Sequence, residues 1–514
     1  MSKNNHVGLF FRLKTLVNIL AAFRIHEFRA AKSLINKKYK DYSLPVALVK
    51  LVGWSLEKMR VTIPNAMPWM SEKKPVSKKP FWLESKNPLY NYPWEKNLNS
   101  KLPEFVDTLV IGAGFTGASA AYYWSKNAPE GRNMLVLEMG EAADGASGRN
   151  QGTIVMGRFF AMVRDTVKNH LKFSRPDLTT TQQKHLAEQF ADVYCSAAEH
   201  NAELIKQTIT DEKFDVDYHR KGWIQEHSRE QQDRLKESVA AGIEHGHTDW
   251  VAIDPEEVFK VSGMKVDYPA GFSKGAATWH PAKWVWSLLE TALKNPNVQF
   301  YSRTKVLKVS SDENKGYRIE TDRGVVYAKN VLYANESYLP KLDTEFHNVI
   351  IPSQEQLSSG IGYPQDMPTD NSISGWFYFG TRRDNVLFMG SDSTHLPDKL
   401  AGNNNPSRFL TKFAFSEYLR VYGPFNFTLT NEWSGTTGYT PDEFPIVGSV
   451  DNRGKYVIAG MTGSGSGVAF NAARCIVNRI LNITDEPDDY PEEYFSPSRL
   501  LSPNKHKWPQ IKNN

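Results

Sequence analysis

A glycine-rich turn between an apolar run and an alanine-rich stretch constrains the fold of this chain more than any other feature. Residues 106–111 are mostly apolar and predict a short buried strand. Gly112-Ala-Gly-Phe-Thr-Gly117 follows, and the alanine-rich stretch after it predicts a helix to about Lys126. Residues 134–137 form a second apolar run that ends in Glu138. This order predicts one βαβ unit.

The glycines of this turn and the acid behind it have separate physical roles. Gly112 allows a tight turn, Gly114 lets the backbone approach a pyrophosphate, and Gly117 lets the helix pack closely on the strand. Phosphates at this place meet the positive end of the helix dipole. Glu138 falls 21 residues after Gly117, where an acid can accept hydrogen bonds from ribose hydroxyls. We therefore predict a dinucleotide site; the acid argues against NADP, and the motif alone leaves FAD and NAD open.

The cysteines and histidines argue against a metal site or a disulfide framework. Cys195 and Cys475 are far apart and outside any CxxC pattern. His245 and His247 flank Gly246, but no further ligand follows at metal-binding spacing. We predict no metal. The length of 514 residues predicts two or more domains, at about 150 residues per domain.

Positive charge is concentrated at the N-terminus. Residues 1–50 contain ten Lys or Arg and two acids, a net charge of +8, whereas the whole chain carries +5. The rest of the chain is therefore slightly acidic, which argues against nucleic acid as a partner.

The N-terminal 80 residues differ from the rest of the chain. Residues 10–20 and 47–56 are apolar but interrupted by Arg12, Lys14 and Lys50, and both are shorter than the roughly 20 residues of a transmembrane helix. A basic, half-apolar helix pair fits a membrane surface, while packing on the protein's own surface and an organelle transit peptide are alternatives. Residues 71–80, with two prolines and four lysines, predict an exposed linker. We expect a cytoplasmic protein, either free or held peripherally at a membrane.

Further elements follow from local patterns. Residues 179–209 and 281–294 predict helices, and residues 298–309 and 317–332 predict strands, the second broken by a turn at 322–324. Residues 348–433 are rich in aromatic side chains and predict short strands. A glycine-rich turn at 460–467 precedes a helix to about Leu481.

An ordered series of short motifs resembles the D-amino-acid-oxidase-like flavoenzyme family, which includes glycine oxidase, sarcosine oxidase and the γ-glutamylputrescine oxidase group. The resemblance covers about residues 81–481. The motifs are Phe81-Trp-Leu-Glu84, Gly145-Ala-Ser-Gly-Arg-Asn-Gln-Gly152, Thr278-Trp-His-Pro281, Thr304-Lys-Val306, Tyr333-Ala-Asn335, Trp433-Ser-Gly435, Thr440-Pro-Asp442 with Pro445 and Gly448, and Gly460-Met-Thr-Gly-Ser-Gly465.

The resemblance implies an α/β (α+β) fold in which a Rossmann-like FAD-binding domain is interleaved with an antiparallel-sheet substrate domain, after a helical N-terminal extension. We expect the extension and linker at 1–80, the FAD-binding domain at 81–215, 278–345 and 433–485, the substrate domain at 216–277 and 346–432, and a C-terminal tail at 486–514.

The resemblance also implies which residues bind FAD. They are Gly112, Gly114, Phe115, Thr116, Gly117, Glu138, Ser147, Gly148, Arg149, Asn150, Gln151, Val306, Ala334, Gly435, Gly460, Gly463, Ser464 and Gly465. Several relatives hold their flavin through His or Cys. Because residues 147–152 contain neither, and Ser464 stands where some relatives carry His, we expect FAD to be bound non-covalently.

The implied activity is oxidation of a C–N bond in an amine or amino acid. Hydride passes from the carbon beside nitrogen to flavin N5, water hydrolyses the resulting imine, and oxygen or another acceptor takes the electrons. Candidate substrate-pocket residues are Trp376, Tyr378, Arg382, Tyr439 and His280. Core packing is the alternative for the aromatic residues, and Arg382 is in doubt as a carboxylate clamp. Alternative functions are a membrane-associated flavoprotein with an assembly or scaffolding role and little turnover, and an NAD-dependent enzyme.

Overall fold

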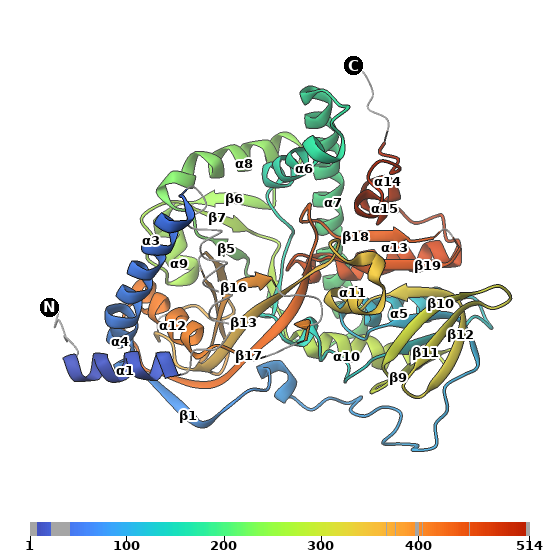
Figure 1. The fold of residues 1–514 in the computed structure, drawn as a ribbon, viewed down its shortest axis with the longest axis horizontal. Helices are drawn as coiled ribbons and strands as arrows, with labels where there is room; N and C mark the ends of the chain where they lie inside the picture. The colour runs from blue at the N-terminus through green and yellow to red at the C-terminus, as the bar shows by residue number, and fades with distance from the viewer. Residues whose placement is uncertain are drawn as a thin grey trace.

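Two large β-sheets organise the chain. The computed structural model describes residues 8–21, 42–365, 367–375, 377–395, 400–402, 405–451 and 453–509. Within these residues one sheet has eight strands and the other nine. In Figure 1 the eight-stranded sheet lies at the right and the nine-stranded sheet at the centre and left. Each sheet collects strands from distant parts of the chain, which confirms the predicted mixed α/β fold with interleaved sheets.

The eight-stranded sheet has a parallel core that contains the predicted βαβ unit. Its parallel strands are β2 (Phe105–Ile111), β3 (Met134–Leu137), β9 (Val298–Tyr301), β12 (Gly324–Tyr333) and β19 (Lys455–Ala459). β10 (Val306–Asp312), β11 (Gly316–Thr321) and β18 (Ile446–Ser449) join it in antiparallel pairs. Leu109 and Val110 are fully buried, as expected for a strand with helices and loops on both faces.

Long helices cover this sheet. α5 (Phe115–Asn127) contacts both α10 (Pro281–Ala292) and α13 (Ala469–Leu481), and α7 (Thr180–Glu212) contacts α13 and α6 (Phe160–Ser174). The start of α7 is fixed by a capping box, in which Thr179 and Gln182 satisfy each other's backbone N–H groups. α10 begins with proline directly after His280. α5, α7, α10 and α13 confirm the predicted helices to within a few residues, whereas α6 was not predicted.

The nine-stranded sheet is mostly antiparallel, and several of its strands are longer than predicted. Its order is β1 (Met70–Ser77), β17 (Phe427–Tyr439), β13 (Ile351–Ile361), β16 (Val386–His395), β15 (Tyr378–Arg382), β14 (Ser372–Ser374), β5 (Trp223–Gln225), β7 (Ala270–Ser273) and β6 (Trp250–Ile253). β13, β16 and β17 have 11, 10 and 13 residues, where short strands were expected.

A helix that the sequence analysis missed covers part of this sheet. α12 (Arg408–Tyr422) buries Phe413, Phe415 and Tyr418 in a cluster with side chains of β15 and β17. Ser407 caps its first turn by accepting a hydrogen bond from the N–H of Leu410. Smaller elements complete the fold: α8 (Gln232–Glu244), α9 (Pro255–Ser262), α11 (Leu339–Leu342), and the two-stranded sheet of β4 (Thr153–Ile154) and β8 (Ala277–Thr278).

The prediction of a linker at residues 71–80 is wrong. Met70–Ser77 is β1, which pairs in parallel with β17 so that Met70 faces Phe427 and Glu72 faces Leu429. Its lysines are exposed, and its proline is tolerated because an edge strand leaves one row of backbone groups to solvent. Part of the N-terminal extension is therefore built into the nine-stranded sheet.

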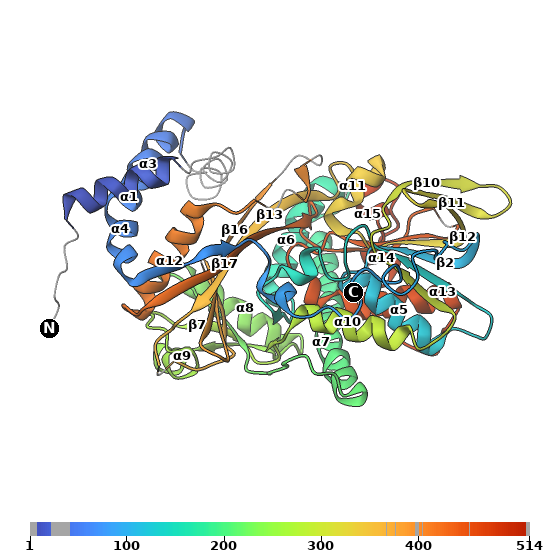
Figure 2. The same ribbon diagram turned by 90° about the horizontal axis from the view of Figure 1, so that it is seen from below.

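The N-terminal helices lie at the end of the molecule farthest from the eight-stranded sheet (Figures 1 and 2). α1 (Leu9–Ala21) and α3 (Leu44–Glu57) precede α4 (Ile63–Ala66), which packs on α12. Trp54 of α3 meets Phe413 edge to face, with ring centroids 5.3 Å apart. Among the described residues, no helix is long and apolar enough to cross a membrane.

The expected C-terminal tail is largely folded onto the rest of the protein. α14 (Glu492–Phe495) and α15 (Ser498–Leu501) lie near β18, and Tyr490, Phe495 and Arg499 are fully buried. Residues 510–514 lie outside the described residues.

Candidate cofactor and substrate site

One large cavity is lined by both sheets. Its volume is about 950 Å³, at the upper end of the range of roughly 300–1,000 Å³ for ligand pockets. The ends of β2, β3 and β12 line one part, and a face of the nine-stranded sheet lines another. A ligand that fills this cavity would therefore touch both halves of the fold.

The first glycine turn forms one end of the cavity. Gly112 has a φ of +107°, and a Cβ built there would lie 2.7 Å from the Ala334 carbonyl oxygen. A Cβ on Gly117 would lie 1.8 Å from the Gly112 carbonyl oxygen, so α5 packs on the turn only without a side chain. α5 has no side-chain cap, which leaves N–H groups of its first turn available to an anion. This geometry fits a pyrophosphate.

Glu138 lies at the end of β3 and lines the same part of the cavity. Its carboxylate accepts hydrogen bonds from the N–H groups of Ala113 and Gly140, at 2.9 and 2.8 Å. Burial raises the pKa of Glu138, and these two N–H groups partly oppose that rise. A carboxylate has about four lone-pair sites, so Glu138 retains acceptor capacity for ribose hydroxyls.

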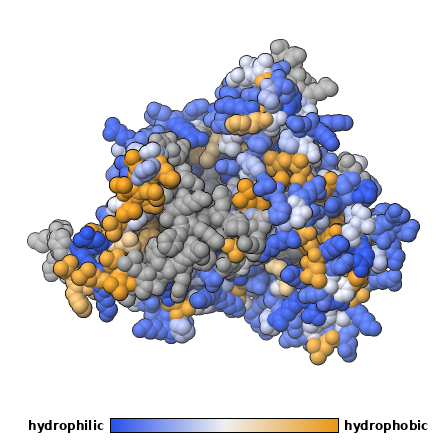
Figure 3. Space-filling model, viewed as in Figure 1, coloured by the Kyte–Doolittle hydropathy of each residue, from blue (hydrophilic) through white to orange (hydrophobic). Residues whose placement is uncertain are grey.

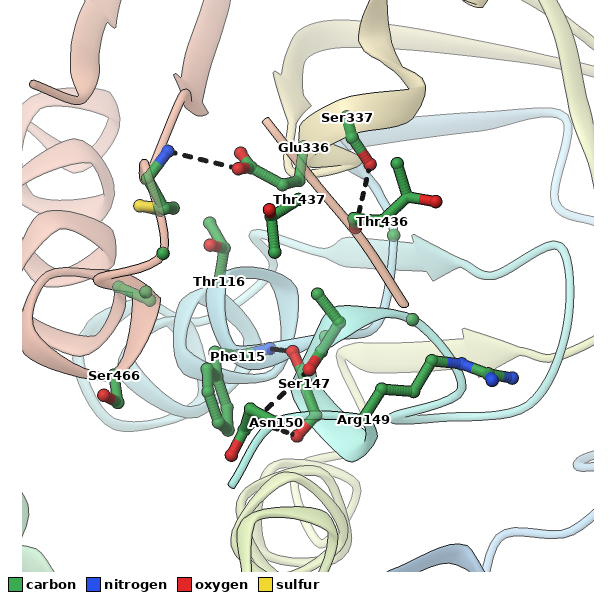
Figure 4. A pocket seen from close by; sticks show the side chains of 18 of the residues that line it. Phe115, Thr116, Ser147, Arg149, Asn150, Glu336, Ser337, Thr436, Thr437 and Ser466 are labelled. Carbon is green, nitrogen blue, oxygen red and sulfur yellow. Dashed lines mark hydrogen bonds between the residues drawn. The ribbon is translucent and has the colours of Figure 1, made fainter. Parts of the chain in front are cut away.

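The segment at residues 145–152 is held rigidly against the turn. Ser147 Oγ accepts a hydrogen bond from the Phe115 N–H at 2.8 Å, and Asn150 Nδ2 donates to the Ser147 carbonyl oxygen at 2.7 Å (Figure 4). Arg149 Nε donates to the Asp144 carbonyl oxygen at 2.7 Å. These polar side chains line the cavity.

The late glycine turn (residues 460–467) lies beside the start of α5, since a Cβ on Gly465 would be 3.9 Å from Phe115 Cδ2. Gly463, Ser464 and Gly465 border the cavity just before α13, whose first turn also lacks a side-chain cap. Ser466 Oγ donates to the Thr153 carbonyl oxygen at 2.8 Å and so fixes the turn to β4. Backbone N–H groups at this helix start can stabilise negative charge on a ring edge.

The nine-stranded sheet supplies the remaining wall. Glu355 and Leu357 of β13 point into the cavity two residues apart, and Tyr439 of β17 donates from its hydroxyl to Glu355 Oε1 at 3.0 Å. Trp223 and Trp250 extend this wall. The sequence analysis missed Glu355, although an acid inside a long run of otherwise uncharged residues is a signal that could have drawn attention to it.

Most of the expected FAD-binding residues line the cavity. They are Gly112, Gly114, Phe115, Thr116, Glu138, Ser147, Arg149, Asn150, Gln151, Val306, Ala334, Gly463, Ser464 and Gly465. Four glycines do not line it, which corrects the expectation: Gly117, Gly148, Gly435 and Gly460. Each instead allows close packing behind the wall; a Cβ on Gly460, for example, would lie 2.3 Å from Thr440 Cγ2.

Two of the substrate-pocket candidates lie elsewhere. Tyr378 and Tyr439 line the cavity, whereas Arg382 and His280 do not, and Trp376 lies outside the described residues. The Arg382 guanidinium donates to four backbone carbonyl oxygens at 2.7–2.9 Å, so its role is structural and it is no carboxylate clamp. His280 caps α10 and meets Ser85 Oγ at 3.0 Å.

His245 and His247 have carboxylate neighbours. Nδ1 of His245 and Nε2 of His247 lie 3.1 and 3.3 Å from Asp192 Oδ1, and Nδ1 of His247 lies 3.4 Å from Glu199. No group of three or more side chains that could hold a metal ion occurs in the part of the chain that the structure describes.

Comparison with known proteins agrees with this geometry. The probable oxidoreductase OrdL of Haemophilus influenzae is 22% identical over 420 residues, which cover 78% of this chain and 88% of OrdL. The L-proline dehydrogenase of P. horikoshii superimposes with a TM-score of 0.62 at 16% identity, over 77% of this chain and 98% of that one. Glycine oxidase from Geobacillus kaustophilus gives 0.60 at 16% identity, with the same coverage.

These structural likenesses show the shared fold. The family model described as "DAO: FAD dependent oxidoreductase" matches residues 107–479, which is well over half of the chain. The matched range includes both glycine turns and the strands that line the cavity between them. The chain therefore belongs to the DAO family of FAD-dependent oxidoreductases, and FAD is its cofactor.

Proposed function

We propose that this enzyme oxidises a C–N bond of a small amine or amino acid. The substrate loses a hydride from the carbon beside nitrogen and a proton from nitrogen, and water hydrolyses the imine to a carbonyl compound and an amine or ammonia. FAD, when bound, supplies the hydride acceptor. One observation supports this proposal above all: a single cavity joins the dinucleotide cradle to a wall that carries Glu355, Tyr378 and Tyr439.

The wall residues have the chemistry that such a substrate requires. Glu355 already accepts hydrogen bonds from the hydroxyls of Tyr439 and Thr437, at 3.0 and 3.3 Å, and it can accept a further one from a substrate N–H group because a carboxylate has about four lone-pair sites. Trp223, Trp250 and Leu357 supply apolar surface that excludes water. Together they would hold the reacting carbon against the cofactor, and such positioning accounts for much of the rate enhancement in reactions of this kind.

Anaerobic mixing tests the proposal directly. The FAD-loaded protein is mixed with a panel of primary amines, secondary amines and amino acids, and flavin absorbance is followed. We expect bleaching with at least one class, and admission of oxygen then distinguishes peroxide formation from transfer to another acceptor. If no compound bleaches a flavin that dithionite does reduce, the proposal is wrong and a scaffolding role without turnover is favoured.

We further propose that α1 and α3 hold the enzyme at an anionic membrane surface. Phe10, Val49 and Leu9 are 82%, 74% and 71% exposed. Figure 3 shows hydrophobic side chains gathered over these two helices. Further exposed apolar side chains on them are Phe11, Leu13, Val17, Leu44, Val46, Leu48, Val52 and Leu56. The same helices carry Arg12, Lys14 and Lys50, and such a mixture suits an interface between acyl chains and anionic headgroups.

Vesicle co-sedimentation tests this second proposal. We expect the protein to pellet with phosphatidylserine-containing vesicles and much less with phosphatidylcholine alone. The double variant Phe10→Asp/Val49→Asp should stay in solution. Phe173→Asp is the matched control, since Phe173 is 85% exposed on α6 and should not affect binding. Equal partitioning of all variants contradicts the proposal, and concentration-dependent dimers in solution would assign the surface to a second copy instead.

A further inference from the structure

Glu336 has a backbone conformation that non-glycine residues seldom adopt. It follows the Tyr333-Ala-Asn335 turn at the end of β12 and has a φ of +47°. Non-glycine residues seldom adopt this conformation, and where they do, the surrounding structure holds them there. The side chain is accordingly fixed by contacts with two other segments.

One carboxylate joins three segments of the fold. Glu336 Oε1 accepts hydrogen bonds from the N–H groups of Gly438 and Met461, at 2.9 and 3.1 Å, and Oε2 accepts from Gly460 at 2.8 Å. Gly438 lies in β17 of the nine-stranded sheet, whereas Gly460 and Met461 begin the late glycine turn after β19. Figure 4 shows the carboxylate directed toward the backbone of that turn.

The hydrogen bonds that affect the pKa of Glu336 all come from backbone N–H groups. Glu336 is half-buried and lines the cavity. Burial raises the pKa of Glu336 to about 7, although the three N–H donors lower it, and no charged side chain of the described residues contributes to the shift. A Cβ on Gly438 would lie 2.9 Å from Oε1, so this contact needs glycine in β17.

We propose that Glu336 is a positioning residue that fixes the late glycine turn against the end of β17 and thereby shapes the cavity where the flavin ring of FAD binds. The turn has no other side-chain acceptor for the Gly460 and Met461 N–H groups among the described residues. If the carboxylate is lost, these two N–H groups have no acceptor and the turn is free to move away from β17. The inference depends on FAD in this cavity and on no particular substrate.

Glu336→Gln tests the inference with little change in volume. A glutamine side chain offers one acceptor oxygen and a nitrogen that only donates, so at least one of the three N–H groups loses its acceptor. We expect the dissociation constant of FAD from the full-length protein to rise about tenfold, which corresponds to the loss of a buried hydrogen bond. Glu345→Gln, an exposed acid nine residues further on, should bind FAD as the natural protein does.

A pH titration separates positioning from general stability. No histidine of the described residues lines the cavity, but Glu138 does and burial raises its pKa too, so a change in the flavin absorption spectrum near pH 7 is assigned to Glu336 only if Glu336→Gln abolishes it. We expect this transition in the natural protein and in Glu345→Gln, and its loss in Glu336→Gln. Unchanged FAD affinity in a folded Glu336→Gln overturns the inference. If that variant does not fold, Gly438→Ala replaces it, because its Cβ would lie 2.9 Å from Glu336 Oε1, and unchanged FAD affinity in that folded variant overturns the inference.

Discussion

Arg499 gives the sharpest stability prediction. Its side chain is fully buried in the folded C-terminal segment, and Nε donates to Asp442 Oδ2 at 2.6 Å. Nη2 lies 3.3 Å from Asp442 Oδ1, and the guanidinium also donates to the carbonyl oxygens of Tyr494, Phe444 and Pro445. These contacts join α15 to the loop that follows Tyr439, and so they help to hold the end of β17, which carries Tyr439, in place.

Arg499→Met keeps the apolar stem and removes the charge. The Asp442 carboxylate, 3% exposed, would then be buried without its counter-ion, and three carbonyl oxygens would lose a donor. Removal of one partner from a buried pair costs about 3–5 kcal/mol. We expect a loss of this size in the free energy of unfolding. Arg499→Met/Asp442→Asn should lose less than Arg499→Met alone, because the uncompensated charge is gone.

Urea unfolding of the FAD-loaded protein, followed by tryptophan fluorescence at neutral pH, measures this loss. Arg453→Met is the matched control: its side chain is 67% exposed and pairs with Asp451, and such surface pairs contribute about 0–1 kcal/mol. The reasoning is refuted if Arg499→Met costs less than about 1 kcal/mol, or if the double variant is less stable than the single one.

Three further predictions concern the glycine turn, the excluded clamp and a histidine pair. Gly117→Ala should yield protein without bound FAD, measured as flavin per protein after purification, because its Cβ would lie 1.8 Å from the Gly112 carbonyl oxygen; normal FAD content would contradict this. Arg382→Met should lower the unfolding midpoint but leave the KM of an amino-acid substrate within about threefold, whereas loss of a true clamp would raise it by tenfold or more. Burial lowers the pKa of His247, but its two carboxylate partners raise it to about 9 overall. The stability that His247 contributes is therefore complete below about pH 6.5 and lost as the pH rises toward 9, so the difference in unfolding midpoint between the natural protein and His247→Gln should shrink over that interval; a constant difference would refute it.

Local signals predicted the elements whose partners lie close in sequence. The strand at residues 106–111, the helix after Gly114 and the strand at 134–137 follow directly from apolar runs and glycine spacing. β1 was missed because its partner β17 lies more than 350 residues away. The lysines and proline of β1 are typical of a linker, and only the pairing with β17 identifies the segment as an edge strand. α12 could have been found, since Phe409, Phe413 and other aromatic side chains recur at helical spacing after the cap Ser407.

The residues around the first glycine turn could be predicted because they are close together in sequence. The residues of the substrate wall could not be predicted in this way. Which face of a strand meets a cavity depends on register and on what covers the sheet. Tyr378 and Arg382 are four residues apart on β15 and so share a face, yet only Tyr378 reaches the cavity. The carbonyl oxygens of Gln151 and Gly152 lie over the guanidinium of Arg382 and take its hydrogen bonds. The sequence of β15 gives no sign that Gln151 and Gly152 lie over Arg382, because these two residues are more than 200 residues away along the chain.

Glu336 illustrates how the two halves of the site depend on each other. The βαβ unit brings together much of the expected adenosine diphosphate site, because its turn, its helix and Glu138 are neighbours in sequence. The ring end cannot form in this way, since the late glycine turn must be placed against a strand of the other sheet. A carboxylate that accepts from both segments makes the cavity wall sensitive to the packing of the two sheets. For this reason, changes far from the cavity that loosen the sheets, such as the loss of Arg499, should weaken FAD binding as well as stability.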